Sequence, residues 1–413
     1  MSETVHIPQL RFPEFSGDWN RVKIQKLLDD KSIISHLDGN HGALYPRSEE
    51  FTKEGVPYVT ANDFINGKVD LKKCKCLPVE RASQFKKGIA HNGDVLFAHN
   101  ATVGPVALLE TDLEYVVLST TATYYRCDNN TLINKYLKVY LTSNDFVRQY
   151  SRVMSQSTRN QVPITTQRLF YINLPDKPEQ QKIAAFLTAV DSKIEQLSKK
   201  QELLGEYKKG LMQQIFSQAI RFRAGDTPGQ PLLPNGNSPS GSDFPNWEEK
   251  RLGDLCEITT GKLDANAMVE GGQYRFYTCA KEYYKIDDYA FDTDALIVSG
   301  NGANVGYIHH YQGKFNAYQR TYVLDSFTDN IIFVKFVLDE YLHKRIMKEK
   351  NEGNTPYIVM GTLTDMKINL PSFSEQTKIA IFLSSIDSKI EQVGKQLDES
   401  KQFKKALLQQ MFV

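Results

Sequence analysis

Apolar residues recur at alternating steps of three and four along two long segments of the chain. The first series runs from Leu187 to Ile215 and the second from Leu383 to Met411. This spacing predicts helices with a seam of period 3.5, which is typical of coiled coils. The predicted apolar seam positions are Leu187, Val190, Ile194, Leu197, Leu204, Leu211, Leu383, Ile386, Ile390, Val393, Leu397 and Leu407.

The two segments are copies of one another. Residues 174–217 and 370–413 align at a constant offset of 196, with 22 identities over 44 positions. The identities fall on polar as well as apolar positions, which indicates an internal duplication. We expect the two helices to pair with each other as an antiparallel coiled coil related by a pseudo-two-fold axis. The alternative is that each helix packs only against its own globular body.

Each copy closes a larger unit that opens on a tryptophan. The stretch Phe12–Trp19 resembles Phe244–Trp247, and these two tryptophans are the only ones in the chain. The predicted order is a first body over residues 1–173, a first helix over 174–223 and a linker over 224–243, then a second body over 244–369 and a second helix over 370–413. The linker is rich in Gly, Pro, Ser and Asn, a composition typical of flexible connections.

The bodies combine strand-like and helical runs, so we expect a mixed α/β fold. Runs rich in β-branched and aromatic residues predict strands at 56–63, 93–100, 114–127, 273–279, 294–300 and 317–325. Longer amphipathic runs predict a helix at 131–152 and another at 330–349. The second body is shorter than the first, so the units share their helices more closely than their bodies.

Composition places the chain among globular proteins. The 413 residues carry a net charge of +1, with 41% hydrophobic and 24% charged residues. No apolar run approaches the roughly 18 residues of a membrane span, and the first residues lack the features of a signal peptide. We therefore expect a soluble cytoplasmic protein with reduced cysteines.

Motifs of catalysis are absent from the sequence. It contains no phosphate-binding G-x-x-x-x-G-K-S/T loop, no H-E-x-x-H zinc motif and no N/D-P-P-Y/F methyltransferase motif. The glycines of Ser299–Gly306 are more typical of a turn after a strand than of a dinucleotide site. We predict no catalytic residue, no metal site and no cofactor for this chain, and interpret it as a binding protein.

Polar loops are the candidate binding elements. Each body has one loop after an aligned strand and another before the long helix, rich in the Asn, Gln and Arg side chains that contact base edges. Basic residues nearby suit phosphates. The predicted DNA-binding residues are Lys86, Lys87, His99, Asn100, Thr102, Arg159, Asn160, Gln161, Asn301, Asn304, Arg320, Asn354 and Thr355. The alternative is that these residues satisfy turn geometry or form a solvated face.

The order of these elements resembles the specificity subunits of type I restriction–modification systems. The resemblance rests on the segments "EQQKIAAFLTAVDSKIEQ" (179–196) and "EQTKIAIFLSSIDSKIEQ" (375–392), the two tryptophan openings, and the endings "LMQQIF" and "LLQQMF". It implies a non-catalytic DNA reader in which each body is a target recognition domain for one half of a split, asymmetric sequence.

The resemblance also implies partners. The paired helices would set the gap between the half-sites and dock two modification subunits, which use S-adenosylmethionine. Two restriction subunits would add cleavage that depends on ATP and Mg²⁺. The polar repeats are the predicted docking residues, namely Glu179, Gln180, Asp191, Glu195, Glu375, Gln376, Asp387 and Glu391. Two other functions remain open, a coiled-coil protein adaptor and a nucleic-acid enzyme with an unrecognised active site.

Overall fold

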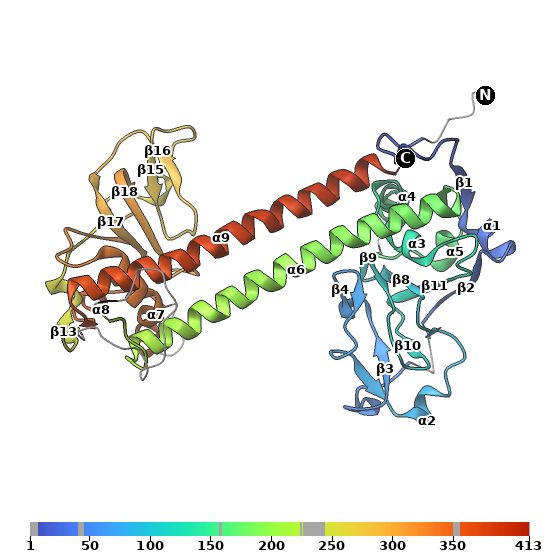
Figure 1. Ribbon diagram of the computed structural model, residues 1–413, viewed down its shortest axis with the longest axis horizontal. Coiled ribbons are helices and arrows are strands. Elements are labelled where there is room, and N and C mark those ends of the chain that lie inside the picture. Colours follow the sequence, from blue (N-terminus) through green and yellow to red (C-terminus); the bar gives the residue numbers. More distant parts are fainter. Residues whose placement is uncertain are drawn as a thin grey trace. The chain divides into compact units, whose positions relative to one another are not determined.

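The computed structural model describes residues 7–39, 45–156, 159–223, 225, 244–349 and 356–412 (Figure 1). The chain divides into two compact units, the first formed by Met1–Lys199 with Gly394–Val413 and the second by Lys200–Val393. Each unit therefore combines one globular body with parts of both long helices. Among the described residues, no helix is long and apolar enough to cross a membrane.

The body of the first unit contains a main sheet of strand order β2-β11-β8-β9-β5-β4 and a second sheet of order β6-β3-β10-β7. Its strands are β1 (Asn20–Lys23), β2 (Ile33–Asp38), β3 (Val56–Val59), β4 (Phe64–Ile65), β5 (Lys68–Val69), β6 (Lys75–Leu77), β7 (Ile89–Ala90), β8 (Val95–Asn100), β9 (Thr102–Leu108), β10 (Val116–Leu118), β11 (Ala122–Cys127) and β12 (Tyr171–Leu174). Its helices are α1 (Ile24–Asp29), α2 (Val79–Ala82), α3 (Asn134–Tyr140), α4 (Asn144–Ser155) and α5 (Ile164–Gln167), with 3₁₀ turns at Ser48–Glu50 and Ala61–Asp63.

The body of the second unit contains a main sheet of order β14-β19-β17-β18-β15-β16. Its strands are β13 (Glu248–Arg251), β14 (Glu257–Thr260), β15 (Tyr274–Tyr277), β16 (Tyr284–Ile286), β17 (Phe291–Ser299), β18 (Ile308–Ala317), β19 (Thr321–Asp325) and β20 (Lys367–Leu370). Its helices are α7 (Ile331–Glu349) and α8 (Met360–Thr364), with 3₁₀ turns at Leu252–Asp254 and Ala265–Ala267.

The two main sheets share one spatial order of strands, but the last two strands are reversed along the chain, because edge strand β4 precedes β5 whereas edge strand β16 follows β15. Strands β2, β11, β8, β9, β5 and β4 take the places that β14, β19, β17, β18, β15 and β16 take in the second unit. In both sheets the fifth strand pairs parallel to the fourth, at β5–β9 and at β15–β18. Most strand and helix runs expected from the sequence are present, but the run at 114–127 is two strands of different sheets, β10 and β11, and the run at 131–152 is two helices, α3 and α4. Ser143 lies between α3 and α4 and caps the start of α4, because its side chain accepts a hydrogen bond from the Phe146 amide.

A small antiparallel sheet ties the start of each body to the start of its long helix. Strand β1 pairs with β12, and β13 pairs with β20. The opening strands directly follow Trp19 and Trp247, and the closing strands directly precede the long helices α6 (Lys177–Phe216) and α9 (Phe373–Gln410). The helices therefore leave their bodies from a hydrogen-bonded base.

A buried glutamate fixes the first turn of each long helix. In the first unit, Glu179 accepts two hydrogen bonds from Arg11, both at 2.7 Å, and one from the Trp19 indole at 3.2 Å. In the second unit, Glu375 accepts from Arg221 at 3.1 and 2.7 Å and from the Trp247 indole at 3.3 Å. We call Glu179 and Glu375 the root glutamates.

The arginines of these sites belong to a second short repeat. Phe12, beside Arg11, packs against Phe186 at 5.7 Å between ring centroids, and Phe222, beside Arg221, packs against Phe382 at 5.6 Å. The helix α6 ends at Phe216, so the Arg221–Phe222 pair lies beyond it and packs on the second unit.

The neighbouring glutamines are also internal. Gln180 accepts from the Ile133 amide and donates to the carbonyls of Thr131 and Pro175. Gln376 accepts from the Asn330 amide and donates to the Pro371 carbonyl and to Asp329 Oδ1. All four side chains of the two Glu-Gln pairs are at most 1% exposed. The expectation that these pairs dock partners does not fit their burial, because their polar atoms are satisfied within their own unit.

The long helices pair antiparallel along the predicted seam. The predicted apolar seam residues are buried or half-buried, including Leu187, Leu197, Leu383 and Val393 at 4% exposure or less. In the first unit Asp191 of α6 pairs with Lys404 of α9 at 2.6 Å, and in the second unit Asp387 of α9 pairs with Lys208 of α6 at 2.6 Å. Asp191 and Asp387 are equivalent in the duplication, as are Lys208 and Lys404, so each unit contains the same pair with the helices exchanged.

The end of each helix completes the core of the body at the start of the other helix. In the first unit, the Phe412 ring lies 6.2 Å from Trp19, 6.0 Å from Tyr136 and 5.7 Å from Tyr140, centroid to centroid. In the second unit, Phe216 lies 5.9 Å from Phe333. Burial of these aromatic ends explains the repeated Gln-Gln-x-Phe endings, since each phenylalanine contributes about 2 kcal/mol of transfer free energy.

Replacement of a root glutamate should destabilise its own unit. We expect Glu179→Ala to lower the free energy of unfolding of the first unit by about 3 kcal/mol, because Arg11 and Trp19 lose their buried acceptor. The fluorescence of Trp19, followed through urea unfolding in a Trp247→Phe background, measures this unit. Glu206→Ala on the exposed face of α6 is the control and should change the value by less than about 0.5 kcal/mol. An equal effect of both variants would contradict the role of Glu179.

The interhelical ion pair of the second unit should show coupling. Asp387→Lys and Lys208→Asp should each destabilise the unit, and the doubly exchanged variant should regain about 1 kcal/mol, because the opposite charges face each other again. Trp247 fluorescence in a Trp19→Phe background reports the transition. Purely additive effects would show that the two side chains do not interact in solution.

Candidate nucleic-acid interface

Two polar loops meet at the end of strand β8 in the first unit. Residues 99–102 span the end of β8 and the start of β9, and residues 159–162 precede α5. The Ala101 amide donates to the Asn160 carbonyl at 3.0 Å, and the Asn160 side chain donates to the Ala101 carbonyl at 2.8 Å. Ala101 has a φ of 64°, a left-handed conformation that turns the chain sharply between β8 and β9. The two loops that the sequence singled out in this body therefore form one surface.

A buried glutamine holds the second of these loops against the sheet. Gln167 is fully buried, and its Oε1 accepts from Tyr125 at 2.6 Å, from Thr123 at 3.1 Å and from His36 Nε2 at 3.2 Å. Its amide nitrogen donates to the Val162 carbonyl at 2.9 Å. His36 Nδ1 is buried without a hydrogen-bond partner among the described residues, but the four bonds of Gln167 hold the loop in place before any ligand arrives.

The histidine in this network is neutral. His36 stacks on Tyr125 with 4.1 Å between ring centroids, and burial lowers the pKa of His36 to about 3. The ring therefore donates from Nε2 to Gln167 as an uncharged group at physiological pH. Desolvation also raises the pKa of Tyr125, which keeps its hydroxyl proton for Gln167. The rings of His36 and Tyr125, which lie behind the loops, are therefore polar but uncharged.

The second unit places equivalent loops together. The Gly300 carbonyl accepts from the Ile358 amide at 2.8 Å, and Asn301 bridges to Tyr357. Gly302 has a φ of 79°, so it takes the left-handed position that Ala101 takes in the first unit. The Ile358 carbonyl accepts a hydrogen bond from the Tyr322 hydroxyl at 2.8 Å. In the first unit, the Gln167 amide donates the equivalent bond to the Val162 carbonyl. The backbone arrangement is thus shared, while the side chains that support it differ.

The predicted DNA-binding residues of the first unit fall into three groups. Thr102, Arg159 and Asn160 are exposed on the joined loops, with half-buried Asn100 and Gln161 beside them. Lys86 and Lys87 follow α2 near the second sheet, where Lys86 is exposed and Lys87 pairs with Asp38 at 3.3 Å. His99 is 1% exposed and lies beneath the loops. The expectation of a base contact from His99 does not fit its burial.

Part of the polar character of these loops is internal. The Asn100 side-chain oxygen accepts from the Ala101 amide at 2.9 Å, and the Asn304 side chain donates to the Cys279 carbonyl at 3.1 Å. These bonds are the turn-stabilising alternative that the sequence left open. In the second unit Arg320 is exposed and Asn301 is half-buried, whereas Asn354 and Thr355 lie outside the described residues.

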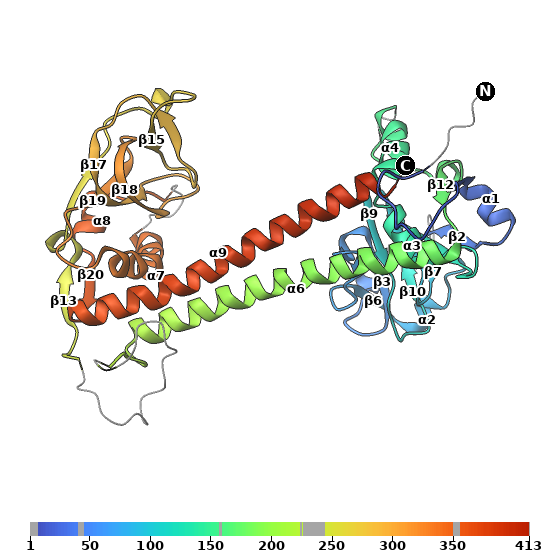
Figure 2. The same ribbon diagram turned by 45° about the horizontal axis from the view of Figure 1, so that its top comes forward.

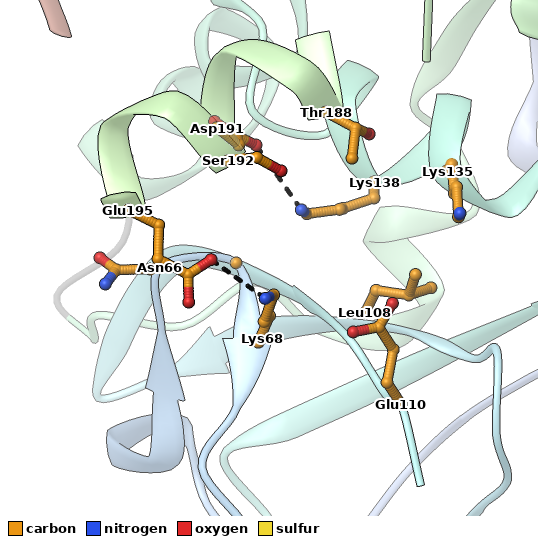
Figure 3. A pocket seen from close by; sticks show the side chains of 11 residues that line it. Asn66, Lys68, Leu108, Glu110, Lys135, Lys138, Thr188, Asp191, Ser192 and Glu195 are labelled. Atoms are coloured by element: carbon orange, nitrogen blue, oxygen red, sulfur yellow. Dashed lines mark hydrogen bonds and ion pairs between the residues drawn. The ribbon is translucent and has the colours of Figure 1, made fainter. Parts of the chain in front are cut away.

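A pocket lies between the first body and helix α6 (Figure 3). Lys68 reaches Glu195 at 3.1 Å, and Lys138 reaches Asp191 at 3.7 Å. Burial lowers the pKa of Lys138, and Asp191 opposes that shift by stabilising the charged form. Because Asp191 also pairs with Lys404, this carboxylate joins the body, α6 and α9 within the first unit. The pocket is therefore a structural junction with oppositely charged walls.

Sequence reasoning missed Gln167, Arg11 and Arg221. The Leu-Arg-Phe stretch at 10–12 and the Ile-Arg-Phe stretch at 220–222 are similar, and this similarity was the available signal for the arginines. Gln167 is a single polar residue in the short helix α5, and nothing in the surrounding sequence indicates that it is buried and hydrogen-bonded. Within the described part of the chain, no group of three or more His, Cys, Asp or Glu residues is arranged to hold a metal ion.

The chain is similar over most of its length to proteins of one family. Residues 34–204 and 245–399 match the type I restriction modification DNA specificity domain. The EcoDI specificity subunit of Escherichia coli is 41% identical over 167 residues, a match that spans 39% of this chain and 37% of that subunit. The MjaVIII specificity subunit of Methanocaldococcus jannaschii is 24% identical over 437 residues, covering 97% of this chain and 92% of that subunit.

Solved structures show the same fold. The S subunit of a type I restriction–modification system from M. genitalium superposes with a TM-score of 0.64 at 16% identity, covering 98% of this chain and 99% of that one. A chain from a structure of type I complex assembly and conformational transition superposes with a TM-score of 0.53 at 17% identity, covering 96% of this chain and 97% of that one. With the two matched specificity domains, the polar loops and the paired helices, the chain belongs to the type I restriction–modification specificity subunits, the non-catalytic subunits that recognise DNA sequence.

Proposed function

We propose that each body recognises one half of a bipartite, asymmetric DNA target through its joined polar loops. The observation that carries this proposal is the combination of one backbone arrangement with two sets of side chains. The first unit presents Asn100, Ala101 and Thr102 where the second presents Asn301, Gly302 and Ala303. The shared backbone arrangement orients the loops of both bodies in the same way. Because the loop side chains differ, each body recognises a different DNA half-site.

The exposed side chains suit this task. Arg159, Asn160 and Thr102 of the first unit, and Arg320 of the second, combine hydrogen-bond donors and acceptors with positive charge. Asn and Arg form bidentate bonds with base edges in the major groove, and each such pair contributes about 1–3 kcal/mol of discrimination. Because Gln167 fixes the loop backbone, less conformational entropy is lost on binding.

We also propose that the long helices dock two copies of the same modification subunit, which supplies S-adenosylmethionine-dependent methylation. Asp191 and Asp387 serve the interhelical pairs, so burial leaves a different set of repeated residues for partners. Four of the exposed identical pairs lie at one-turn spacing on one helix face, and these are Ser192 with Ser388, Glu195 with Glu391, Gln196 with Gln392, and Lys199 with Lys395. We call this set the repeated stripe.

The repeated stripe supports docking because the fold alone does not require it. Exposed helix positions accept most polar residues, and other exposed positions of the two helices do differ, as at Glu206 and Gln402. Two identical partners require identical docking surfaces, so they would account for exposed residues that are the same on both helices although the two bodies differ. Restriction subunits that use ATP and Mg²⁺ would complete the assembly in the cytoplasm.

Exchange of one body should change one half of the target. Replacing residues 248–366 with the matching segment of another specificity subunit should alter one half of the methylated sequence and leave the other half and the gap unchanged, because the second body reads only its own half-site. Genome-wide mapping of N6-methyladenine in cells carrying the complete system measures both halves at once. A change in both halves would contradict independent reading.

Substitutions in the repeated stripe should remove partners without changing the bases read. Gln196→Arg with Gln392→Arg should abolish binding of both modification subunits, and either substitution alone should remove one copy, because each places a bulky charge in one docking face. The mass of the assembled complex, measured by light scattering, counts the copies. Gln402→Arg makes the same substitution at an exposed position of α9 that is not repeated, and it should leave the mass unchanged. A similar loss of mass with Gln402→Arg would contradict the proposal that the repeated stripe is the docking face.

A further inference from the structure

One face of the main sheet differs between the two units. In the first unit, Leu96, Ala107 and Tyr124 of the main sheet pack into a single apolar cluster with residues of the second sheet. In the second unit, the equivalent face carries a smaller cluster around Tyr277, Ile297 and Phe315, and the described residues contain no second sheet there. Strands β15 and β16 lie at the edge of this sheet away from α7 in both views (Figures 1 and 2).

An arginine takes part in covering this face. The Arg275 guanidinium carbon lies 4.3 Å from the ring centroid of Tyr283 and 4.2 Å from that of Tyr311. Its Nη1 donates to the Tyr277 hydroxyl at 3.3 Å. Among the described residues no carboxylate pairs with Arg275, and no further hydrogen bond engages its other nitrogens. The guanidinium is thus oriented by aromatic rings while keeping donors without an acceptor.

Arg275 is connected to the polar loops of the second unit. The segment after β15 runs from Thr278 to Tyr283, and its backbone accepts from Asn304 at the Cys279 carbonyl. Its next carbonyl, that of Ala280, lies 3.0 Å from His309 Nε2. The exposed rings of Tyr283 and Tyr307 flank this segment at 43% and 38% exposure. The arginine, the aromatic rings and the loop that follows β17 therefore lie along one connected surface.

We propose that Arg275 reads a guanine in the half-site of the second body, an inference that rests on the DNA recognition proposed above. A planar guanidinium forms two parallel hydrogen bonds with guanine O6 and N7 in the major groove. Such recognition requires a fixed orientation, which the two rings supply, and donors that no carboxylate has taken. A lysine, with a flexible stem and a point charge, cannot form the same pair of bonds.

The experiment uses the full chain assembled with its modification subunits and a random duplex library, selected and sequenced at one salt concentration. Wild type should yield a bipartite motif with an invariant guanine in one half. Arg275→Lys, which keeps the positive charge, should reduce discrimination at that guanine about tenfold and leave every other position unchanged. Lys314→Ala is the control, since Lys314 lies over the Tyr289 ring at 4.4 Å on the same sheet, and it should not change the motif.

Three other outcomes would overturn the inference. If Arg275→Lys kept the motif while Arg275→Ala weakened binding equally to all sequences, the arginine would contact phosphate. If neither variant changed binding or motif while both lowered the unfolding temperature, Arg275 would only pack the loop. If both halves of the motif changed together, Arg275 would act through the fold. A wild-type complex that selected no motif would instead refute the proposed function itself, so the two failures are distinguishable.

Discussion

The exclusion of two apolar helix seams from water is the constraint on which the structure depends. A helix with apolar residues every 3.5 positions is unstable alone, and the duplication supplies a second helix with the same seam. Two lysines within the heptad series, Lys208 and Lys404, then favour the antiparallel direction, because in that arrangement each meets an aspartate, Asp387 or Asp191. Phe216 and Phe412 act in the same sense, since each is buried only where its helix ends against a body. Seam, charge and aromatic end thus favour one pairing.

Duplication alone does not separate residues kept for folding from residues kept for function. Glu179 and Glu195 are both repeated and both acidic, yet the first is 1% exposed and the second is exposed. The difference comes from Arg11, which lies 168 residues before Glu179 and reaches it only in the fold. Once burial removes the internal pairs, the repeated residues that remain define a surface. The structure therefore sharpens the docking proposal by reducing the set of candidates.

The periodic parts of the fold could be predicted from sequence because their signals are local and repeated. The seam, both long helices and most strands follow from spacing within a few turns or a few residues, whereas the break of the run at 131–152 at the Ser143 cap was missed. Gln167 could not be predicted, because its partners His36 of β2 and Thr123 and Tyr125 of β11 are more than 40 residues away along the chain. His99 was misjudged for the same reason, since its position beneath the loops depends on sheet topology. Long-range polar contacts decide the interior of each body, and sequence spacing carries no record of them.

The described residues of the second unit contain no covering sheet, and this difference supports the proposal that the second body reads DNA with different chemistry. An apolar sheet face is stable only when other residues cover it and exclude water. In the first unit, Val116 and Leu118 of the second sheet cover this face. In the second unit aromatic residues do so, and an aromatic cover can hold a cation that an aliphatic cover would exclude. Arg275 lies there between Tyr283 and Tyr311 at little desolvation cost, because the ring faces replace part of its hydration. The same spatial order of strands thus offers an oriented guanidinium in one unit and an aliphatic interface in the other, and this difference in the cover adds to the reversed order of the two edge strands in making the bodies unlike.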